Sequence, residues 1–159
     1  IKIAKTFTPN FRCLVPEKSN EITTVCRLNL EKISKKKLNL LLTICNSNNI
    51  QLSAFINPKK KIIDTAKSLG FHTVELHTGP LDREKVNKLD IKKINEMINY
   101  SYRKNLIVNI GHGLNFSNIK YIKNRHKVDT VHIGHFIISE AIFLSLPKVI
   151  KIFKNLIKL

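Results

Sequence analysis

The chain has 159 residues, a formal net charge of +17 and 43% hydrophobic residues. This length supports one domain with a real core but is short for a closed eight-unit α/β barrel, which typically takes about 250 residues. The hydrophobic content excludes a disordered basic tail. The charge comes from 23 Lys and only 5 Arg, and the chain has no Trp, so we interpret the charge as lysine on solvated helix faces rather than a nucleic-acid surface.

Short apolar runs alternate with longer helical patterns along the chain. In chain order, the expected strands are residues 11–15, 50–56, 73–77, 106–110 and 128–133. The expected helices are residues 29–45, 59–69, 90–103, 115–124, 136–144 and 147–157. Asn29 and Asn115 are suited to cap helices, Gly70 to end one, and Pro147 to the first turn of the last.

This order of strands and helices predicts an α/β fold with a parallel sheet and right-handed crossovers. Each strand–helix unit averages about 32 residues, and eight such units make about 250 residues, the usual barrel size. Five units are also enough for an open, doubly wound sheet. The pattern alone leaves both architectures open.

Residues 108–112 and 131–135 are near copies of each other. Each is an apolar strand that runs into a Gly-His pair, Gly111-His112 and Gly134-His135. Glycine there lets a ligand approach the backbone, and the amides opening the next helix bind anions. The last two loops of barrels commonly form such a phosphate site. The alternative is a pair of ordinary tight turns.

Two side chains are candidates for acid–base work. His112 lies between Gly111 and Gly113 with little steric cover, and its ordinary pKa near 6.5 suits proton donation. Glu75 lies in the middle of an expected strand, where both faces are normally buried, so its carboxylate needs a partner or a ligand. A solvent-facing loop histidine and a structural ion pair are the alternative interpretations.

The cysteines indicate a reducing compartment rather than a metal or disulfide framework. Cys13, Cys26 and Cys45 are odd in number and too far apart for a close-pair zinc spacing.

No apolar run approaches the roughly 18 residues of a membrane span. The chain begins with Ile1 and shows no signal peptide, so we expect a processed product or a fragment whose missing start would hide one.

An ordered set of short motifs carries a resemblance to a known family. The motifs are CLVPEK (13–18), EITT (21–24), IQLSAFI (50–56), VELHTG (74–79), VNIGHGL (108–114) and IGH (133–135). Together they resemble pyridoxine 5′-phosphate synthases. The resemblance implies a TIM (β/α)8 barrel, of which residues 1–159 are the part with strands 4–8, so that about three βα units are absent. It also implies a cytoplasmic homo-octamer without metal or organic cofactor.

The same resemblance implies an activity and a set of site residues. Family members condense 3-amino-2-oxopropyl phosphate with 1-deoxy-D-xylulose 5-phosphate to give pyridoxine 5′-phosphate, phosphate and water. His112 matches the proton donor and Glu75 the glutamate that stabilises the transition state. The matched substrate- and phosphate-binding positions are Thr23, Gly113, Gly134 and His135.

The chain also departs from the family pattern. An acidic residue and glycines are usual where Val25, Cys26 and Arg27 stand, and Phe136 and Glu140 replace a small residue and part of a Gly-Arg step. The family's general base and third-strand carboxylate have no counterpart, so we expect the 159-residue chain alone to lack synthase activity. The alternatives are an inactive fragment, another phosphate-binding barrel enzyme and, least favoured, a basic nucleic-acid-binding protein.

Overall fold

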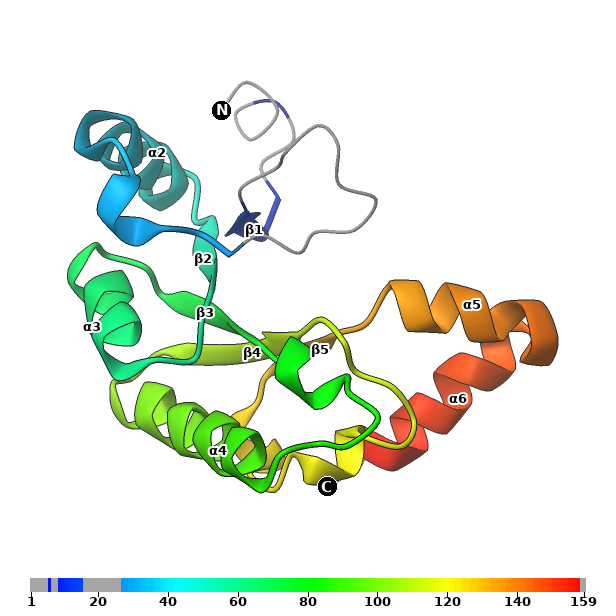
Figure 1. Cartoon of the computed structure of the whole chain (residues 1–159). Helices are drawn as coiled ribbons and strands as arrows, with labels where there is room; N and C mark the ends of the chain where they lie inside the picture. Colours follow the sequence, from blue (N-terminus) through cyan, green and yellow to red (C-terminus); the bar gives the residue numbers. More distant parts are fainter. Residues whose placement is uncertain (1–5, 7–8, 16–26, 158–159) are drawn as a thin grey trace.

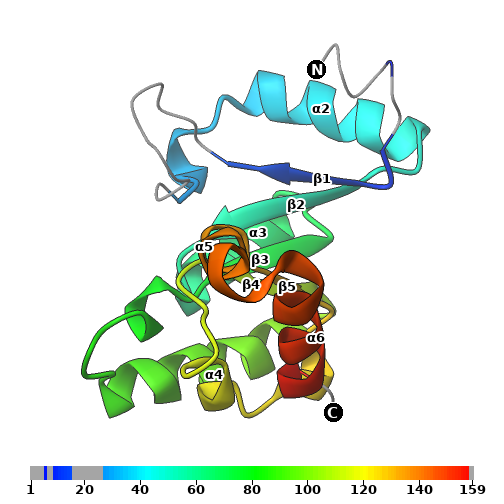
Figure 2. The same ribbon diagram turned by 90° about the vertical axis from the view of Figure 1, so that its right-hand side faces the viewer.

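A single parallel sheet organises the molecule. The computed structural model describes residues 6, 9–15 and 27–157, and in them five strands pair in the order β1-β2-β3-β4-β5. The strands are β1 (Phe11–Leu14), β2 (Gln51–Ile56), β3 (Thr73–His77), β4 (Ile107–Gly111) and β5 (Thr130–His132). Figure 2 shows them succeeding one another in chain order. The order contains no reversal, which excludes the doubly wound alternative for these strands.

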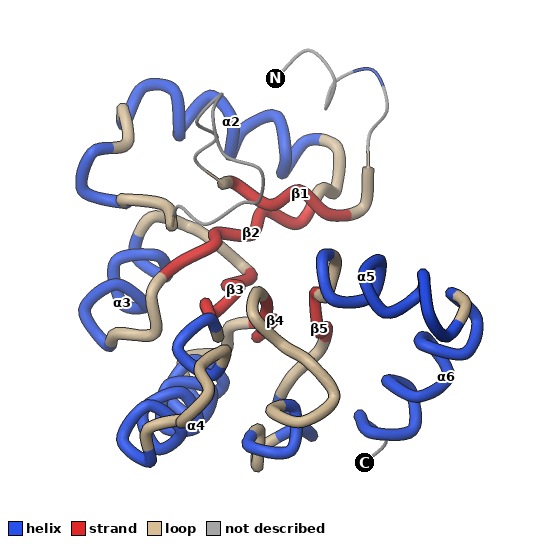
Figure 3. Tube along the Cα trace, turned by 45° about the vertical axis from the view of Figure 1, so that its right-hand side comes forward, coloured by secondary structure: helices blue, strands red, loops and turns tan. Residues whose placement is uncertain are grey.

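Helices cover one side of this sheet. The α-helices are α2 (Lys35–Ser47), α3 (Lys60–Ser68), α4 (Lys88–Arg103), α5 (His135–Leu144) and α6 (Leu146–Ile157). Helices α2, α3 and α4 follow the outer side of the arc of strands, and α5 and α6 lie together beyond β5 (Figures 1 and 3). A parallel sheet in sequential order with its helices outside is half of an α/β barrel.

The two faces of the sheet differ in chemistry because side chains alternate along each strand. One face is apolar and forms the core with the helices, through Leu52, Ala54, Val74, Leu76, Val108 and Ile110. The other face carries buried polar residues, namely Ser53, Thr73, Glu75, His77 and Asn109. Strand β3 is buried along its whole length, which confirms the expectation that Glu75 lies on a buried strand. The polar face positions the candidate site.

The expected helix 115–124 is wrong. The described connection between β4 and β5 contains two 3-10 turns, η3 (Ile119–Tyr121) and η4 (Arg125–Lys127), and no α-helix. The side chain of Asn115 accepts hydrogen bonds from the amides of Ser117 and Asn118, at 3.0 and 2.9 Å. These local bonds compete with helical bonding for the same backbone groups.

The first expected helix is divided in two. Asn29 caps only a short 3-10 turn, η1 (Leu30–Lys32), by accepting from the amide of Glu31. Ser34 then caps α2 through the amide of Lys37. The other helices begin and end within a few residues of expectation, and α6 has Pro147 in its first turn. Among the described residues, none of the helices combines the length and apolar character needed to cross a bilayer.

Candidate active site at the carboxyl ends of the strands

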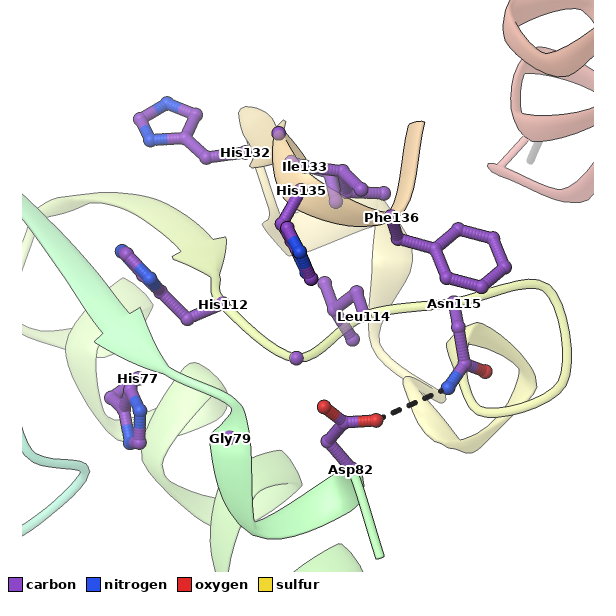
Figure 4. Close-up of a pocket in the computed structure, with 13 residues that line it drawn as sticks. His77, Gly79, Asp82, His112, Leu114, Asn115, His132, Ile133, His135 and Phe136 are labelled. Carbon is purple, nitrogen blue, oxygen red and sulfur yellow. Dashed lines mark hydrogen bonds between the residues drawn. The ribbon is translucent and has the colours of Figure 1, made fainter. Parts of the chain in front are cut away.

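A pocket of about 890 Å³ opens where β3, β4 and β5 end. Four of the residues expected in the site line it together: His112, Gly113, Gly134 and His135. Figure 4 shows the further lining side chains His77 and Asp82 from the region of β3 and His132 from β5. The carboxyl edge of parallel strands is where barrel and open α/β proteins place their ligands.

The turn after β4 presents His112 to this pocket. Both His112 and Gly113 have left-handed backbone angles, with φ of 68° and 69°, a conformation that is uncommon for histidine and found at functional sites. A Cβ on Gly113 would lie 2.8 Å from Cβ of Asp82 and 3.0 Å from Cα of Gly79. Glycine at 113 is thus required by both the turn and the close approach of η2 (Gly79–Leu81).

Thr78 holds this turn in place through hydrogen bonds. Its hydroxyl lies 2.7 Å from the carbonyl oxygens of both Gly111 and His112, and its amide donates to Gly111 at 2.8 Å. Thr78 is completely buried. The loop after β3 therefore holds the loop after β4 in place.

Glu75 lies beneath the pocket as the centre of a hydrogen-bonded cluster. Glu75 as a whole is 3% exposed. Its Oε2 accepts from Nδ1 of His132 at 2.8 Å and from Sγ of Cys13 at 3.6 Å. Its Oε1 lies 3.5 Å from Nε2 of His112. The buried carboxylate thus has the partners that its position on β3 demanded.

The pKa values of the two histidines beside Glu75, His132 and His112, are shifted in opposite directions. The hydrogen bond to Glu75 raises the pKa of His132 above its ordinary value, whereas burial lowers the pKa of His112 despite the nearby carboxylate. Burial and the Glu75 charge raise the pKa of the Cys13 thiol to about 12. The Glu75 contact therefore favours the cationic form of His132, whereas burial favours the neutral form of His112 and the thiol form of Cys13.

His77 borders the same pocket as a neutral imidazole. Burial, and then the charge of Arg27, lower the pKa of His77 to about 4. Nη1 of Arg27 lies 3.4 Å from Nδ1 of His77, so the neutral ring accepts from the guanidinium. Arg27, one of the departures from the family pattern, therefore brings a positive charge to the edge of the site.

The start of α5 supplies the other half of the pocket. The first helical bond runs from the amide of Ile138 to the carbonyl of Gly134, so the amides between them open the helix without helical acceptors. A Cβ on Gly134 would meet no described atom within 4 Å. Free amides beside open space at a helix N-terminus are the arrangement with which proteins bind anions.

The substitutions at Phe136 and Glu140 are accommodated differently. The ring of Phe136 packs edge-on against Phe116 and Phe153, with centroid distances of 5.0 and 5.8 Å, and it fastens α5 to α6. Glu140 lies one turn further along α5 and is not among the described residues that line the pocket. The acidic side chain therefore lies outside the lining of the pocket.

Thr23, with Val25 and Cys26, lies outside the described residues, so its place in the site stays a prediction. Sequence reasoning missed His132 and Thr78. His132 had a signal, because it stands in the second copy of the Gly-His repeat. The described residues hold no group of three or more His, Cys, Asp or Glu side chains arranged for a metal ion.

These features define a class of protein: a partial parallel α/β barrel with a cluster of titratable side chains and an open helix N-terminus at the carboxyl ends of its strands. Residues 1–159 match the family model described as "Pyridoxal phosphate biosynthesis protein PdxJ". The chain belongs to this family.

Curated relatives agree with this assignment. The chain is 36% identical over 159 residues to a pyridoxine 5′-phosphate synthase of Prochlorococcus marinus (strain MIT 9515), covering 99% of the chain and 66% of the relative. It is 35% identical over 161 residues to that of Blochmanniella floridana, covering 99% and 65%. It is 39% identical over 163 residues to that of Pelagibacter ubique (strain HTCC1062), covering 98% and 66%. The chain thus spans about two thirds of the length of these relatives.

Proposed function

We propose that the protein carrying this chain is a pyridoxine 5′-phosphate synthase. It would condense 3-amino-2-oxopropyl phosphate with 1-deoxy-D-xylulose 5-phosphate and release pyridoxine 5′-phosphate, phosphate and water. The observation that carries the proposal is the Glu75–His112 pair, 3.5 Å apart, beneath a pocket with a helix N-terminus on its far side. The names of the relatives support the same activity.

Different parts of the pocket would bind the substrate phosphate and transfer the proton. The amides that open α5, with Gly134 and His135, would hold a substrate phosphate. This assignment rests on the open space above Gly134 and on the positive end of the helix dipole. Gly113, which lines the pocket in the turn after β4, would present its backbone to the substrate.

His112 and Glu75 would handle the proton. Burial lowers the pKa of His112, so the ring takes a proton from solvent and, as an imidazolium, gives it up readily to the substrate. Glu75 stabilises the imidazolium formed in that step, and also positive charge that develops on the condensing amine. This role follows from a buried carboxylate fixed by Cys13 and His132 before the substrate arrives.

The remainder of the proposal concerns the larger assembly. We place the described strands as the fourth to eighth of a (β/α)8 barrel, whose first three units would pair with the outer edges of β1 and β5. In the described residues each of these strands pairs on one side only, and the chain spans about two thirds of its relatives. A homo-octamer in the cytoplasm belongs to the same proposal.

The test is a condensation assay on the full-length protein. We expect product from the two substrates, and His112→Gln should lower kcat by about 10²- to 10⁴-fold, the usual contribution of a proton-transferring group. His126→Gln is the matched control, because His126 is exposed on η4, away from the pocket. Equal rates for His112→Gln and the wild type would refute the assigned role.

A further inference from the structure

The side chain of His132 reaches Glu75 across an intervening strand. His132 ends β5 and pairs with Gly111 of β4, whereas Glu75 lies on β3 beyond it. A Cβ on Gly111 would stand 2.2 Å from Oε1 of Glu75 and 3.1 Å from Cβ of His132. The missing side chain at Gly111 is therefore what allows the two residues to meet.

The contact with His132 gives the two carboxylate oxygens of Glu75 different environments. Oε2 is taken by Nδ1 of His132 at 2.8 Å and by the Cys13 thiol at 3.6 Å. Oε1 is buried and has no hydrogen-bond partner among the described residues, with Nε2 of His112 at 3.5 Å as its neighbour. One oxygen is anchored, and the other is turned toward the proton donor.

The charges around His132 come from several elements. Glu75 on β3 is the carboxylate in contact with it, and Cys13 on β1 joins the cluster as a thiol. His112 after β4, His77 at the end of β3 and His135 at the start of α5 line the same pocket. The Glu75 contact favours a cationic His132, and that cation in turn disfavours protonation of His112.

We propose that His132 is a positioning residue, which anchors Glu75 through Nδ1 so that Oε1 faces His112. His132 itself does not exchange protons with the substrate. The inference deepens the proposed function and rests on it for its catalytic consequence. Its structural content, the Glu75–His132 pair and its effect on His112, is measurable without turnover.

The first experiment is a histidine titration by NMR on the full-length protein. We expect His132 to titrate above 6.5, its ordinary value, and to move downward in Glu75→Gln. We expect His112 to titrate at higher pH in His132→Asn than in the wild type, because the repelling charge is gone. A His132 titration that Glu75→Gln leaves unchanged would overturn the inference, whether or not the protein makes product.

The second experiment separates hydrogen bonding from charge. Asparagine places an amide nitrogen where Nδ1 of His132 stands and can donate to Glu75 without carrying a charge. His132→Asn should therefore keep most of kcat but shift the His112 ionisation in the pH profile upward. His132→Leu loses the bond as well, and should lower kcat about 100-fold with little change in KM, as expected for a misplaced transition-state group.

Matched controls keep the outcomes distinct. His126→Asn should change neither kcat nor the pH profile, and equal melting temperatures show that the variants are folded. If His132→Leu raises KM with kcat unchanged, His132 binds substrate and the positioning role is wrong. Wild-type kcat and pH profile in His132→Leu also overturn it. Absence of product from the folded wild type counts against the proposed function alone, and the titrations still decide the inference.

Discussion

Single residues in the candidate site act mainly by holding one another in place. Thr78 ties two loops together with a hydroxyl that lies 2.7 Å from two carbonyl oxygens. Glu75 joins side chains from β1, β5 and the turn after β4. The geometry of His112 therefore depends on residues that do not themselves line the pocket.

Thr78→Val removes the hydroxyl while keeping the shape of the side chain. We expect it to lower the free energy of unfolding by about 1–3 kcal/mol, because the carbonyls of Gly111 and His112 lose the hydroxyl donor, while Gly111 keeps the amide of Thr78. Denaturant unfolding of the full-length protein measures this. Thr43→Val is the control, since Thr43 bonds to Asn39 on an exposed surface of α2 and should change stability by less than about 0.5 kcal/mol.

The buried His77 makes the free energy of unfolding depend on pH. Its pKa is lowered in the folded protein to about 4, so the unfolded chain binds a proton that the folded chain refuses. The stabilisation that comes from the neutral, buried His77 is fully present above pH 6.5, the ordinary pKa of histidine. It is lost as the pH falls from 6.5 toward 4. We expect a loss on the order of 2–3 kcal/mol over this range.

The comparison with His77→Gln isolates this effect from other titrating groups. Unfolding free energies measured at several pH values should fall more steeply for the wild type than for the variant between pH 6.5 and 4. Parallel curves for the two proteins would contradict the assignment of a neutral, buried His77.

At the residue scale, sequence reasoning found the groups with a local signature. His112 stands out between two glycines, and Glu75 is an acid in an apolar strand. Thr78 and His132 act through partners 34 and 57 residues away in the chain. Such contacts depend on strand register and on the missing side chain of Gly111, neither of which a local pattern reveals.

At the scale of elements, the site is built from strand ends, a tight turn and a helix start. The two pocket glycines have different environments. Gly113 is enclosed by Asp82 and Gly79 and has a left-handed backbone, whereas Gly134 faces open space. Substitutions at these positions therefore separate folding from ligand binding.

Gly113→Ala should destabilise the protein by about 1–3 kcal/mol, because the added methyl group is strained and meets η2. Gly134→Ala should change stability by less than about 1 kcal/mol yet raise KM, since its methyl group enters the anion site. Thermal unfolding and steady-state kinetics measure the two effects. Equal loss of stability in both variants would contradict the contrast.

The α5–α6 pair depends on its aromatic contacts. Phe153 is 4% exposed and its ring lies 4.7 Å from that of Phe116. Phe153→Ala should therefore cost about 3–5 kcal/mol of stability. Leu89→Ala on α4, where Leu89 is 71% exposed, should cost less than about 0.5 kcal/mol. A similar cost for both variants would show that this cluster does not fasten the helices.

Prediction of elements succeeded where periodicity was strong. Residues 73–77 were expected as a strand and form one with the same bounds. The prediction of a helix over residues 115–124 failed because the side chain of Asn115 takes over the backbone donors of Ser117 and Asn118. The sequence pattern could not decide the architecture, because both a barrel and a doubly wound sheet fit the same alternation of strands and helices. The order of the strands in the sheet decided it.

At the scale of the whole molecule, the sheet has two edges. β1 and β5 each pair on one side only within the described residues, and exposed apolar side chains gather on α5 and α6, including Ile138, Ile142 and Phe143. Unpaired strand edges and apolar surface favour association between chains. We therefore expect the 159-residue chain produced alone to associate. Its expected lack of synthase activity is a separate prediction, which rests on the missing counterparts of the general base and the third-strand carboxylate.

Sedimentation velocity checks the first expectation. The 159-residue chain should sediment as heterogeneous oligomers, whereas the full-length protein should form one defined species. A monodisperse 159-residue monomer with a sharp melting transition would count against the proposed half-barrel with open edges.

The central claim is that Glu75 and His112 form the acid–base centre of a pyridoxine 5′-phosphate synthase. The most direct test supplies both substrates to the full-length protein and follows pyridoxine 5′-phosphate and released inorganic phosphate together. We predict equimolar formation of the two by the wild type and a fall of both rates by about 100-fold or more in Glu75→Gln. No product from the folded wild type, or wild-type rates in Glu75→Gln, would contradict the claim.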